Sequence, residues 1–232
     1  YRPGALLPRI GLRMQRLGSE SMAAYARFLR QDPREWGRLL EELPIRTTAF
    51  LRDREAWESL RARALPELLA GRPRGKPFKA WVAGCSTGEE AYSLAMLLRE
   101  ARAPRSSGAA QVLATDLDQA ALAKARAGVY PAGIEADVSM DRIHGFLRPA
   151  PGGYRVAPFL RRAVRFLRHD LLVDAPLPGV DLASCRNLLI ALEENAQRSV
   201  LERFHSCLEP GGLLFLGPAE DARIETGLFE PP

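Results

Sequence analysis

The clearest structural pattern in this sequence is AWVAGCSTGEEAYSLAMLL, residues 80–98. It opens with an apolar run of strand length that ends at Gly84, passes through small residues to Gly88, and continues with a helical pattern. A strand that leads through a glycine-containing loop into a helix is a building unit of α/β sheets. We therefore expect this loop at the carboxyl end of a parallel strand, where its glycines let the backbone approach a ligand.

The same alternation of strands and helices continues to the end of the chain. Strands are predicted at 79–84, 110–116, 163–170, 179–185 and 212–217, and helices at 89–102, 118–128 and 194–208. Continuous apolar strands separated by helices are typical of a mostly parallel sheet that is covered on both faces. The alternation breaks at about 133–163, where a helical piece, a Pro-Gly-Gly turn and short strand candidates predict a small antiparallel β-subdomain.

The beginning of the chain shows helical patterns only. Helices are predicted at 6–18, 19–33, 33–44 and 54–71, and no strand-like alternation separates them. The stretch 71–79 is rich in Gly, Pro and charge, which is typical of a linker. We therefore predict an N-terminal helical domain at 1–70, a linker at 71–79, and an α/β domain at 80–232 that carries the β-subdomain as an insertion.

Composition and cysteine spacing exclude several classes of protein. The 232 residues are 47% hydrophobic and 26% charged, which is ordinary for a globular protein, and no apolar run is long enough to span a membrane. Cys85, Cys185 and Cys207 are too widely spaced for a zinc set or a disulfide framework, so we expect no metal, reduced thiols and a cytoplasmic protein. The first residue is Tyr1 rather than Met, and we expect further domains in a longer chain.

Two carboxylates follow the glycine loop directly. Glu89 and Glu90 stand at the start of the predicted helix, where they complement the helix dipole and would repel a pyrophosphate. The loop also matches neither the P-loop nor the dinucleotide-binding glycine pattern. The pair therefore favours a cationic or amine-bearing ligand, although capping of the helix alone is an alternative explanation.

Asp116 supplies the second part of the predicted site. It ends the second strand of the α/β domain, where a carboxylate can accept hydrogen bonds from both hydroxyls of a ribose. Together with the glycine loop it indicates a nucleoside site without phosphates and with negative charge nearby. S-adenosylmethionine, which joins adenosine to a sulfonium cation and an amino-acid tail, fits this pattern.

Six stretches of the chain resemble the chemotaxis receptor methyltransferases, the CheR family. They are TTAFLRD (47–53), WVAGCSTGEEAYSLAM (81–96), ATDLDQAALAKARAGVY (114–130), VRFLRHDLL (164–172), DLASCRNLLIAL (181–192) and LEPGGLLFLGPAE (208–220), in the order of the family. The helical start and the break at 133–163 resemble the family's N-terminal domain and β-subdomain. The resemblance implies a class I methyltransferase-like, Rossmann-like fold. It also implies methyl transfer from S-adenosylmethionine to glutamate side chains on receptor cytoplasmic helices, with S-adenosylhomocysteine as the product.

The resemblance further implies a set of cofactor-binding residues. They are Arg46, Thr48, Arg52, Gly84, Cys85, Ser86, Glu89, Glu90, Asp116, Leu117, Asp170, Leu171, Arg186 and Asn187. The chain departs from the family pattern at Arg46 and Asp170, where the family often has Asn. It departs again at Ala191, where the family has a Tyr close to the reacting methyl, and at GPAE (217–220), where the family has GHSE.

The implied reaction needs alignment rather than a general base. A glutamate side chain, with a pKa near 4.3, is already ionised when its oxygen attacks the methyl carbon in line. Arg52 is the expected catalytic residue, because its guanidinium could orient the incoming carboxylate, and a salt bridge between the helical domain and the sheet is the alternative. The missing Tyr hydroxyl at Ala191 removes a positioning contact, so we expect a slower reaction or a different substrate geometry.

The net charge of +5 favours an acidic partner, although solvated surface charges in a chain whose genome favours Arg over Lys explain it equally well. Eight arginines in the first forty residues could steer acidic receptor helices, although a solvated helical surface explains any one of them equally well: Arg2, Arg9, Arg13, Arg16, Arg27, Arg30, Arg34 and Arg38. The other acidic partner is nucleic acid. It is not expected, because the chain reads SCRN where many base-modifying methyltransferases carry an NPPY-like tetrapeptide.

Two alternatives to the receptor methyltransferase come from other classes. A methyltransferase-fold module that binds S-adenosylmethionine and acts as a sensor or scaffold, with weak or no activity, is favoured by Arg46, Ala191 and GPAE. A nicotinamide dehydrogenase is disfavoured by the two glutamates at the loop.

Overall fold

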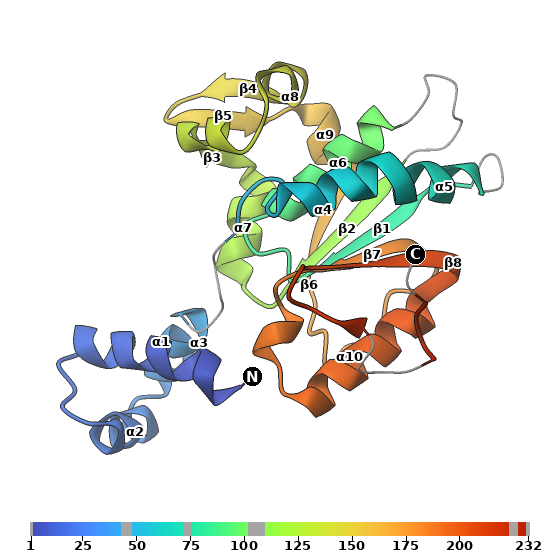
Figure 1. The fold of residues 1–232 in the computed structure, drawn as a ribbon. Coiled ribbons are helices and arrows are strands. Elements are labelled where there is room, and N and C mark those ends of the chain that lie inside the picture. The colour runs from blue at the N-terminus through green and yellow to red at the C-terminus, as the bar shows by residue number, and fades with distance from the viewer. Residues whose placement is uncertain (1, 43–47, 72–75, 102–109, 223–226, 231–232) are drawn as a thin grey trace. The chain divides into compact units, whose positions relative to one another are not determined.

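A computed structural model describes residues 2–42, 48–71, 76–101, 110–222 and 227–230 of the chain (Figure 1). The chain divides into two compact units, of which the first comprises 1–47 with 191–193 and the second 48–190 with 194–232. Over the described ranges, no helix is long and apolar enough to cross a membrane.

The first unit contains three short helices around one small core. They are α1 (Pro3–Arg16), α2 (Met22–Gln31) and α3 (Pro33–Glu42). Glu35 of α3 is fully buried and accepts hydrogen bonds from Arg13 at 2.7 and 2.8 Å and from the Tyr25 hydroxyl at 2.9 Å. A buried carboxylate needs such partners, so Arg13 serves the interior of this unit and is not available to steer a substrate.

The second unit is built on a five-stranded parallel sheet in the order β6-β2-β1-β7-β8. The strands are β1 (Lys79–Ala83), β2 (Gln111–Asp116), β6 (Val164–Arg168), β7 (Val180–Cys185) and β8 (Leu208–Leu216). The chain adds β2 and β6 on one side of β1 and then returns to its other side with β7. The topological switch point therefore lies between β1 and β7.

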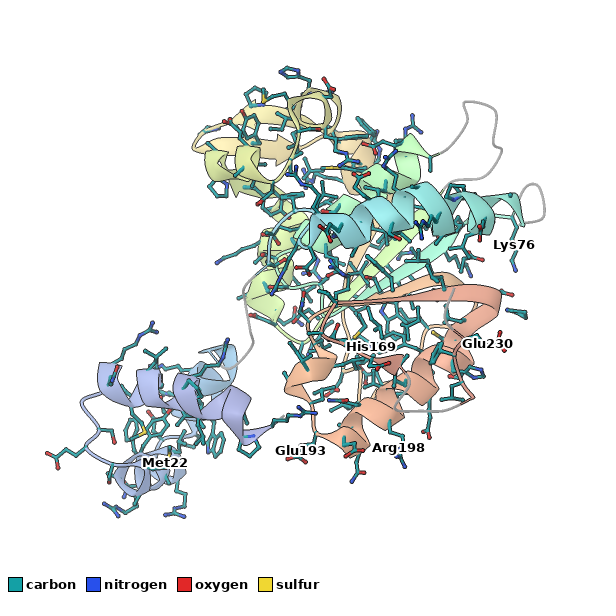
Figure 2. All side chains as sticks on the ribbon, viewed as in Figure 1. Met22, Lys76, His169, Glu193, Arg198 and Glu230 are labelled. Carbon is teal, nitrogen blue, oxygen red and sulfur yellow. The ribbon has the colours of Figure 1, made fainter. Side chains whose placement is uncertain are left out.

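Helices cover both faces of this sheet, as the sequence predicts. The connecting helices are α6 (Glu89–Glu100), α7 (Gln119–Ala127) and α10 (Glu194–Cys207), and a 3-10 turn (Leu189–Ala191) follows β7. Figure 1 shows α6 on one face of the sheet and α10 on the other. Side chains fill the space between the layers (Figure 2), where Trp81 of β1 packs on Phe204 of α10 with ring centroids 5.0 Å apart.

The helical segment predicted at 54–71 belongs to the second unit. It consists of α4 (Arg54–Ser59), a π-helical turn (Leu60–Ala64) and α5 (Leu65–Ala70). The π-helical turn lies just before Pro66. Pro66 has no N–H to donate to the carbonyl one turn earlier, and its ring cannot pack closely against that carbonyl, so the helix widens here. Trp57 is buried and contacts Phe215 of β8 edge-on at 5.2 Å. The units therefore divide between 47 and 48, whereas the sequence placed the boundary of the helical domain at 70.

The predicted insertion forms a three-stranded antiparallel sheet in the order β3-β5-β4. Its elements are β3 (Val129–Pro131), a 3-10 turn (Ala132–Ala136), α8 (Met140–Phe146), β4 (Leu147–Ala150), β5 (Gly153–Val156) and α9 (Pro158–Ala163). Ile143, Leu147 and Val156 belong to the same buried cluster as the main sheet. The β-subdomain therefore shares one core with the sheet that carries the predicted site.

Candidate active site

The carboxyl ends of neighbouring strands bring most of the predicted site residues to one edge of the sheet. Loops after β1, β2, β6 and β7 carry them, because all five strands run in the same direction. At the switch point, the Ser184 hydroxyl of β7 donates to Glu90 Oε1 of α6 at 2.7 Å. Parallel α/β sheets bind ligands at this position.

Asp116 holds the glycine loop in place. Its Oδ2 accepts the N–H of Ser86 at 2.8 Å, and its Oδ1 accepts the N–H of Asp118 at 2.9 Å. Each oxygen keeps a lone pair for a ligand hydroxyl. Burial raises the pKa of Asp116, and the two N–H groups oppose this rise because they favour the carboxylate. The predicted ribose partner is therefore also part of the loop's own structure.

The remaining loop residues contribute through their backbone. The N–H of Cys85 donates to the Thr115 carbonyl at 2.9 Å, while its thiol is buried and has a pKa well above the usual range because of burial. Ser86 has a left-handed φ of 47°. The thiol is accordingly inert, and Cys85 can serve a ligand only through main-chain groups.

The two glycines of the loop have different roles. Gly84 is exposed at the end of β1 with a φ of 71°, and a Cβ there would meet only the side chain of Leu188, with its Cδ2 at 3.0 Å. At Gly88, with a φ of 97°, a Cβ would lie 2.8 Å from the Cβ of Ala125 and 3.0 Å from the Tyr130 hydroxyl. The sequence interpretation was that Gly88 makes room for a ligand. In the structure the absence of a Cβ at Gly88 instead allows close packing against α7 and the β-subdomain.

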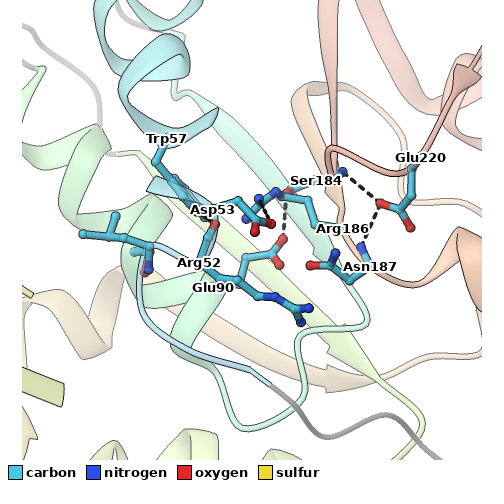
Figure 3. Close-up of polar contacts among 11 residues, drawn as sticks. Arg52, Asp53, Trp57, Glu90, Ser184, Arg186, Asn187 and Glu220 are labelled. Carbon is cyan, nitrogen blue, oxygen red and sulfur yellow. Dashed lines mark hydrogen bonds and ion pairs between the residues drawn. The ribbon is translucent and has the colours of Figure 1, made fainter. Parts of the chain in front are cut away.

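The two glutamates differ in their surroundings. Glu89 accepts from the Thr87 hydroxyl at 2.7 and 2.9 Å and bonds the side chain of Thr48, while burial raises its pKa. Burial raises the pKa of Glu90 to about 7, opposed by Ser184 and by the positive charges of Arg186 and Arg52. Glu90 therefore lies at the switch point among polar groups (Figure 3), beyond what helix capping requires.

Arg186 and Asn187 directly follow β7 and are tied to other parts of the second unit. Arg186 Nη2 donates to Asp53 Oδ2 at 2.9 Å, and its guanidinium lies over the rings of Trp57 and Phe215, at 5.3 and 4.8 Å from their centroids. Asn187 has a left-handed φ of 60°. The guanidinium of Arg186, a residue that the resemblance implied as cofactor-binding, is therefore already held by Asp53 and two aromatic rings.

Sequence reasoning did not single out Glu220. Its carboxylate follows β8 and accepts the N–H groups of Asn187 and Leu189 at 2.7 Å each and that of Gly217 at 2.8 Å. Glu220 therefore fixes the loop after β7. The sequence carried no signal for this contact, because Asn187 and Leu189 lie 33 and 31 residues earlier in the chain.

Asp170 and Leu171 follow β6, and Leu117 follows β2. Asp170 Oδ1 accepts the N–H of Leu172 at 2.9 Å, and the N–H of Asp170 donates to Asp174 Oδ2 at 2.8 Å, so a tight turn forms here. Leu117 is 44% exposed beside Asp116 and offers an apolar surface at the same edge. Arg46 lies outside the described residues.

This set of groups fits S-adenosylmethionine. Asp116 can accept ribose hydroxyls, Leu117 offers an apolar face, and Glu90 can face a cation, while the loop 84–88 carries no basic side chain for a phosphate. The ranges that the structure describes contain no cluster of His, Cys, Asp or Glu that could hold a metal ion.

Comparison with known proteins points to the same cofactor. Two family models match the chain: "CheR methyltransferase, all-alpha domain" over residues 1–44, and "CheR methyltransferase, SAM binding domain" over residues 46–231. The chemotaxis protein methyltransferase of Listeria monocytogenes is 34% identical over 196 residues, which cover 84% of this chain and 73% of the relative. The chemotaxis protein methyltransferase Cher2 of Pseudomonas putida is 31% identical over 220 residues, covering 91% and 80%.

One relative is much longer than this chain. An uncharacterized 104.1 kDa protein of Rhodobacter capsulatus is 36% identical over 222 residues, which cover 95% of this chain and 23% of that protein. The chain thus spans less than a quarter of this relative.

Proposed function

The chain belongs to the CheR methyltransferase family, and on this premise we propose that it methylates glutamate side chains of chemoreceptor cytoplasmic helices. The product would be a glutamyl methyl ester, as made by a protein-glutamate O-methyltransferase. Relatives named chemotaxis protein methyltransferases support the role in chemotaxis. The structural observation that carries the proposal is the Glu90–Ser184 pair at the switch point, with Arg52 close enough to influence Glu90.

S-adenosylmethionine is the cofactor of this family's matched domain, and when bound it supplies an electrophilic methyl group on a sulfonium. We propose that Asp116 holds the ribose hydroxyls and that Leu117 and Asp170 flank the adenine. Glu90 would attract the positively charged end. The exposed Gly84 leaves the backbone open to close approach at the end of β1.

The residues of the chain would act on the substrate carboxylate mainly by alignment. Arg52 would bind the carboxylate with its planar guanidinium, which suits bidentate contacts better than an ammonium does. Correct alignment of two reacting groups can lower a barrier by about 7–11 kcal/mol. No side chain is required to remove a proton, because the substrate glutamate is ionised at neutral pH.

The proposed partner is an acidic helix on the cytoplasmic side of a chemoreceptor, which places the reaction in the cytoplasm. The arginines of the first unit, apart from Arg13, remain candidates for attracting it. Attraction of this kind is screened by salt, so KM for the receptor should rise with ionic strength while kcat stays constant.

A module that binds the cofactor without transferring the methyl group is the second candidate. It is favoured by Ala191, which is 3% exposed and offers no hydroxyl where the family has a Tyr. Titration calorimetry with S-adenosylmethionine and S-adenosylhomocysteine would establish binding. Transfer of a labelled methyl group to a receptor cytoplasmic fragment, released by base, would then support the enzyme, whereas tight binding without any ester would support the module.

A further inference from the structure

We infer that the Asp53–Arg186 ion pair is a positioning device that fixes the backbone of Arg52. Arg186 would then act through Arg52 and not as a ligand of the cofactor. The inference rests on the proposed function, in which Arg52 orients the substrate carboxylate.

The backbone on both sides of Arg52 is in an uncommon conformation. Leu51 and Asp53 have φ values of 51° and 61°, in the left-handed region that side chains other than glycine rarely adopt. Such residues persist only where surrounding contacts determine their conformation, and they gather at functional sites. The segment must therefore be held by bonds from outside it.

Three hydrogen bonds supply this restraint, one at each residue. The N–H of Leu51 donates to the Ser93 hydroxyl of α6 at 3.0 Å. The indole N–H of Trp57 donates to the Arg52 carbonyl at 2.9 Å. Arg186 Nη2 donates to Asp53 Oδ2 at 2.9 Å. The backbone that carries the Arg52 side chain is therefore restrained at Leu51, at Arg52 itself and at Asp53.

Arg186 is suited to act as the anchor of the third bond. It is the first residue after β7, its side chain is 1% exposed, and its guanidinium lies over Trp57 and Phe215. The Arg186 side chain thus extends from the end of the central strand β7, and the rings of Trp57 and Phe215 restrict its movement. The loop that follows it is fixed in turn by Glu220.

Asp53 bonds Arg186 instead of capping the helix that begins after it. It occupies the N-cap position of α4, where an aspartate usually accepts a backbone N–H, yet its side chain makes no capping bond. Its carboxylate, with the side chain 33% exposed, is directed to Arg186 instead. The ion pair is therefore retained at the expense of the local helix cap.

Contact with the cofactor is the competing role for Arg186. Its Nε atom is buried and has no hydrogen-bond partner among the described residues. The competing role predicts weaker binding of cofactor when the pair is altered, whereas a positioning role predicts slower turnover with binding retained. Measurements of binding and turnover on the same variants separate the two.

The test uses Asp53→Asn, which removes the charge with little change of shape, and Arg186→Lys, which keeps the charge but loses the planar fork. Glu58→Gln is the matched control, because it breaks an exposed ion pair of 2.8 Å between Glu58 of the same helix α4 and Arg61 of the π-helical turn that follows it. Three quantities are measured: kcat on a receptor fragment, Kd for S-adenosylhomocysteine, and hydrogen exchange of the amides from Leu51 to Trp57.

We expect Asp53→Asn and Arg186→Lys to lower kcat about 10- to 100-fold, as a misplaced catalytic group does, while Kd changes less than about threefold. Amide exchange in the segment should become faster in both variants, and the control should match the wild type. A tenfold weaker Kd with kcat retained, equal losses of kcat and binding, or unchanged exchange would each overturn the inference. If the wild type transfers no methyl group, the proposed function fails, while the Kd and exchange data still test the restraint.

Discussion

Glu90 is the residue whose chemistry most clearly connects the site to its proposed ligand. Burial raises the pKa of Glu90 to about 7, so the side chain is partly protonated at neutral pH when no cation is bound. A cation beside it would favour the carboxylate and lower this pKa. Cofactor binding and ionisation of Glu90 should therefore be coupled.

We predict that S-adenosylmethionine binds more weakly as the pH falls from about 8 to 6, by roughly tenfold, because one proton must leave Glu90. Calorimetry across this range measures the effect. Glu90→Gln should bind weakly at every pH in the range and lose the dependence. A wild-type affinity that does not change with pH would contradict the assignment of Glu90 to the positive end of the cofactor.

The raised pKa of Glu90 also predicts that the free energy of unfolding of the ligand-free protein depends on pH. The folded pKa lies above the ordinary value of 4.5, so the native state holds the proton more tightly, and stability declines as the pH rises from about 4.5 through 7. Glu90→Gln removes this decline. At pH 8 the variant should melt higher than the wild type, by about 2–4 °C per kcal/mol regained, and at pH 4 the two should be alike. A variant that melts lower at pH 8 would show that Glu90 stabilises the fold as a carboxylate.

Glu220 allows a third prediction, which concerns stability and cofactor binding together. Its carboxylate satisfies three backbone N–H groups, and removal of a charged acceptor from such groups costs about 1–3 kcal/mol or more. Glu220→Ala should lower the free energy of unfolding by about 2 kcal/mol or more in urea and weaken cofactor binding. Glu202→Ala, an exposed position on α10, is the control and should change neither. Equal stability of both variants would refute this role of Glu220.

At the scale of elements, the three helices of the first unit pack around the buried carboxylate of Glu35. Arg13 lowers the pKa of Glu35 by hydrogen bonding, assisted by Tyr25 and opposed by burial. A lowered carboxylate pKa stabilises the fold above the ordinary value of 4.5, and this stabilisation is lost as the pH falls through the folded value. The packing of α1, α2 and α3 should accordingly be sensitive to acid.

We predict that Glu35→Gln destabilises the first unit by about 3–5 kcal/mol, since it leaves Arg13 without its buried partner charge. Hydrogen exchange of α1, α2 and α3 should become faster, while exchange in β1 and β7 remains slow. Glu20→Gln, which alters an exposed glutamate of the same unit, serves as the control. Unchanged protection of the three helices in Glu35→Gln would contradict the role of this ion pair.

The strands and helices themselves could largely be predicted from the sequence, because their apolar periodicity records which faces are buried. The parallel sheet, its connecting helices and the antiparallel insertion were expected and are observed. The assignment of 54–70 to a helical domain differs from the structure, because periodicity shows that a helix has a buried face but not what covers it. Trp57 packs on Phe215, far along the chain.

For the whole molecule, the position of a residue in the sequence could indicate the site only at the end of a predicted strand or at the start of the helix that follows it. Asp116 ends β2 and Glu90 lies at the start of α6, so both were accessible in this way. Glu220 and Asp53 were not assigned, because their roles arise from contacts between distant segments, with Asn187 and Arg186 respectively. The role of Gly88 was likewise hidden, since its neighbours Ala125 and Tyr130 come together only in the folded unit.

The two family matches cover both units, yet the Rhodobacter capsulatus relative extends far beyond the matched part. The proposed substrate therefore follows from the matched part alone, and nothing is proposed for the additional segments of that longer relative. Within the matched part, the central claim is that the switch-point site transfers a methyl group to a glutamate carboxylate.

Mass spectrometry of a receptor cytoplasmic fragment, incubated with the protein and S-adenosylmethionine, tests this claim most directly. We expect one added methyl group on specific glutamates, removed by mild base, and none when those glutamates are replaced by glutamine. We also expect that Arg52→Ala forms the ester at least tenfold more slowly at saturating cofactor. Binding of S-adenosylmethionine with no methylated glutamate on the fragment would show that the protein is not a glutamate methyltransferase.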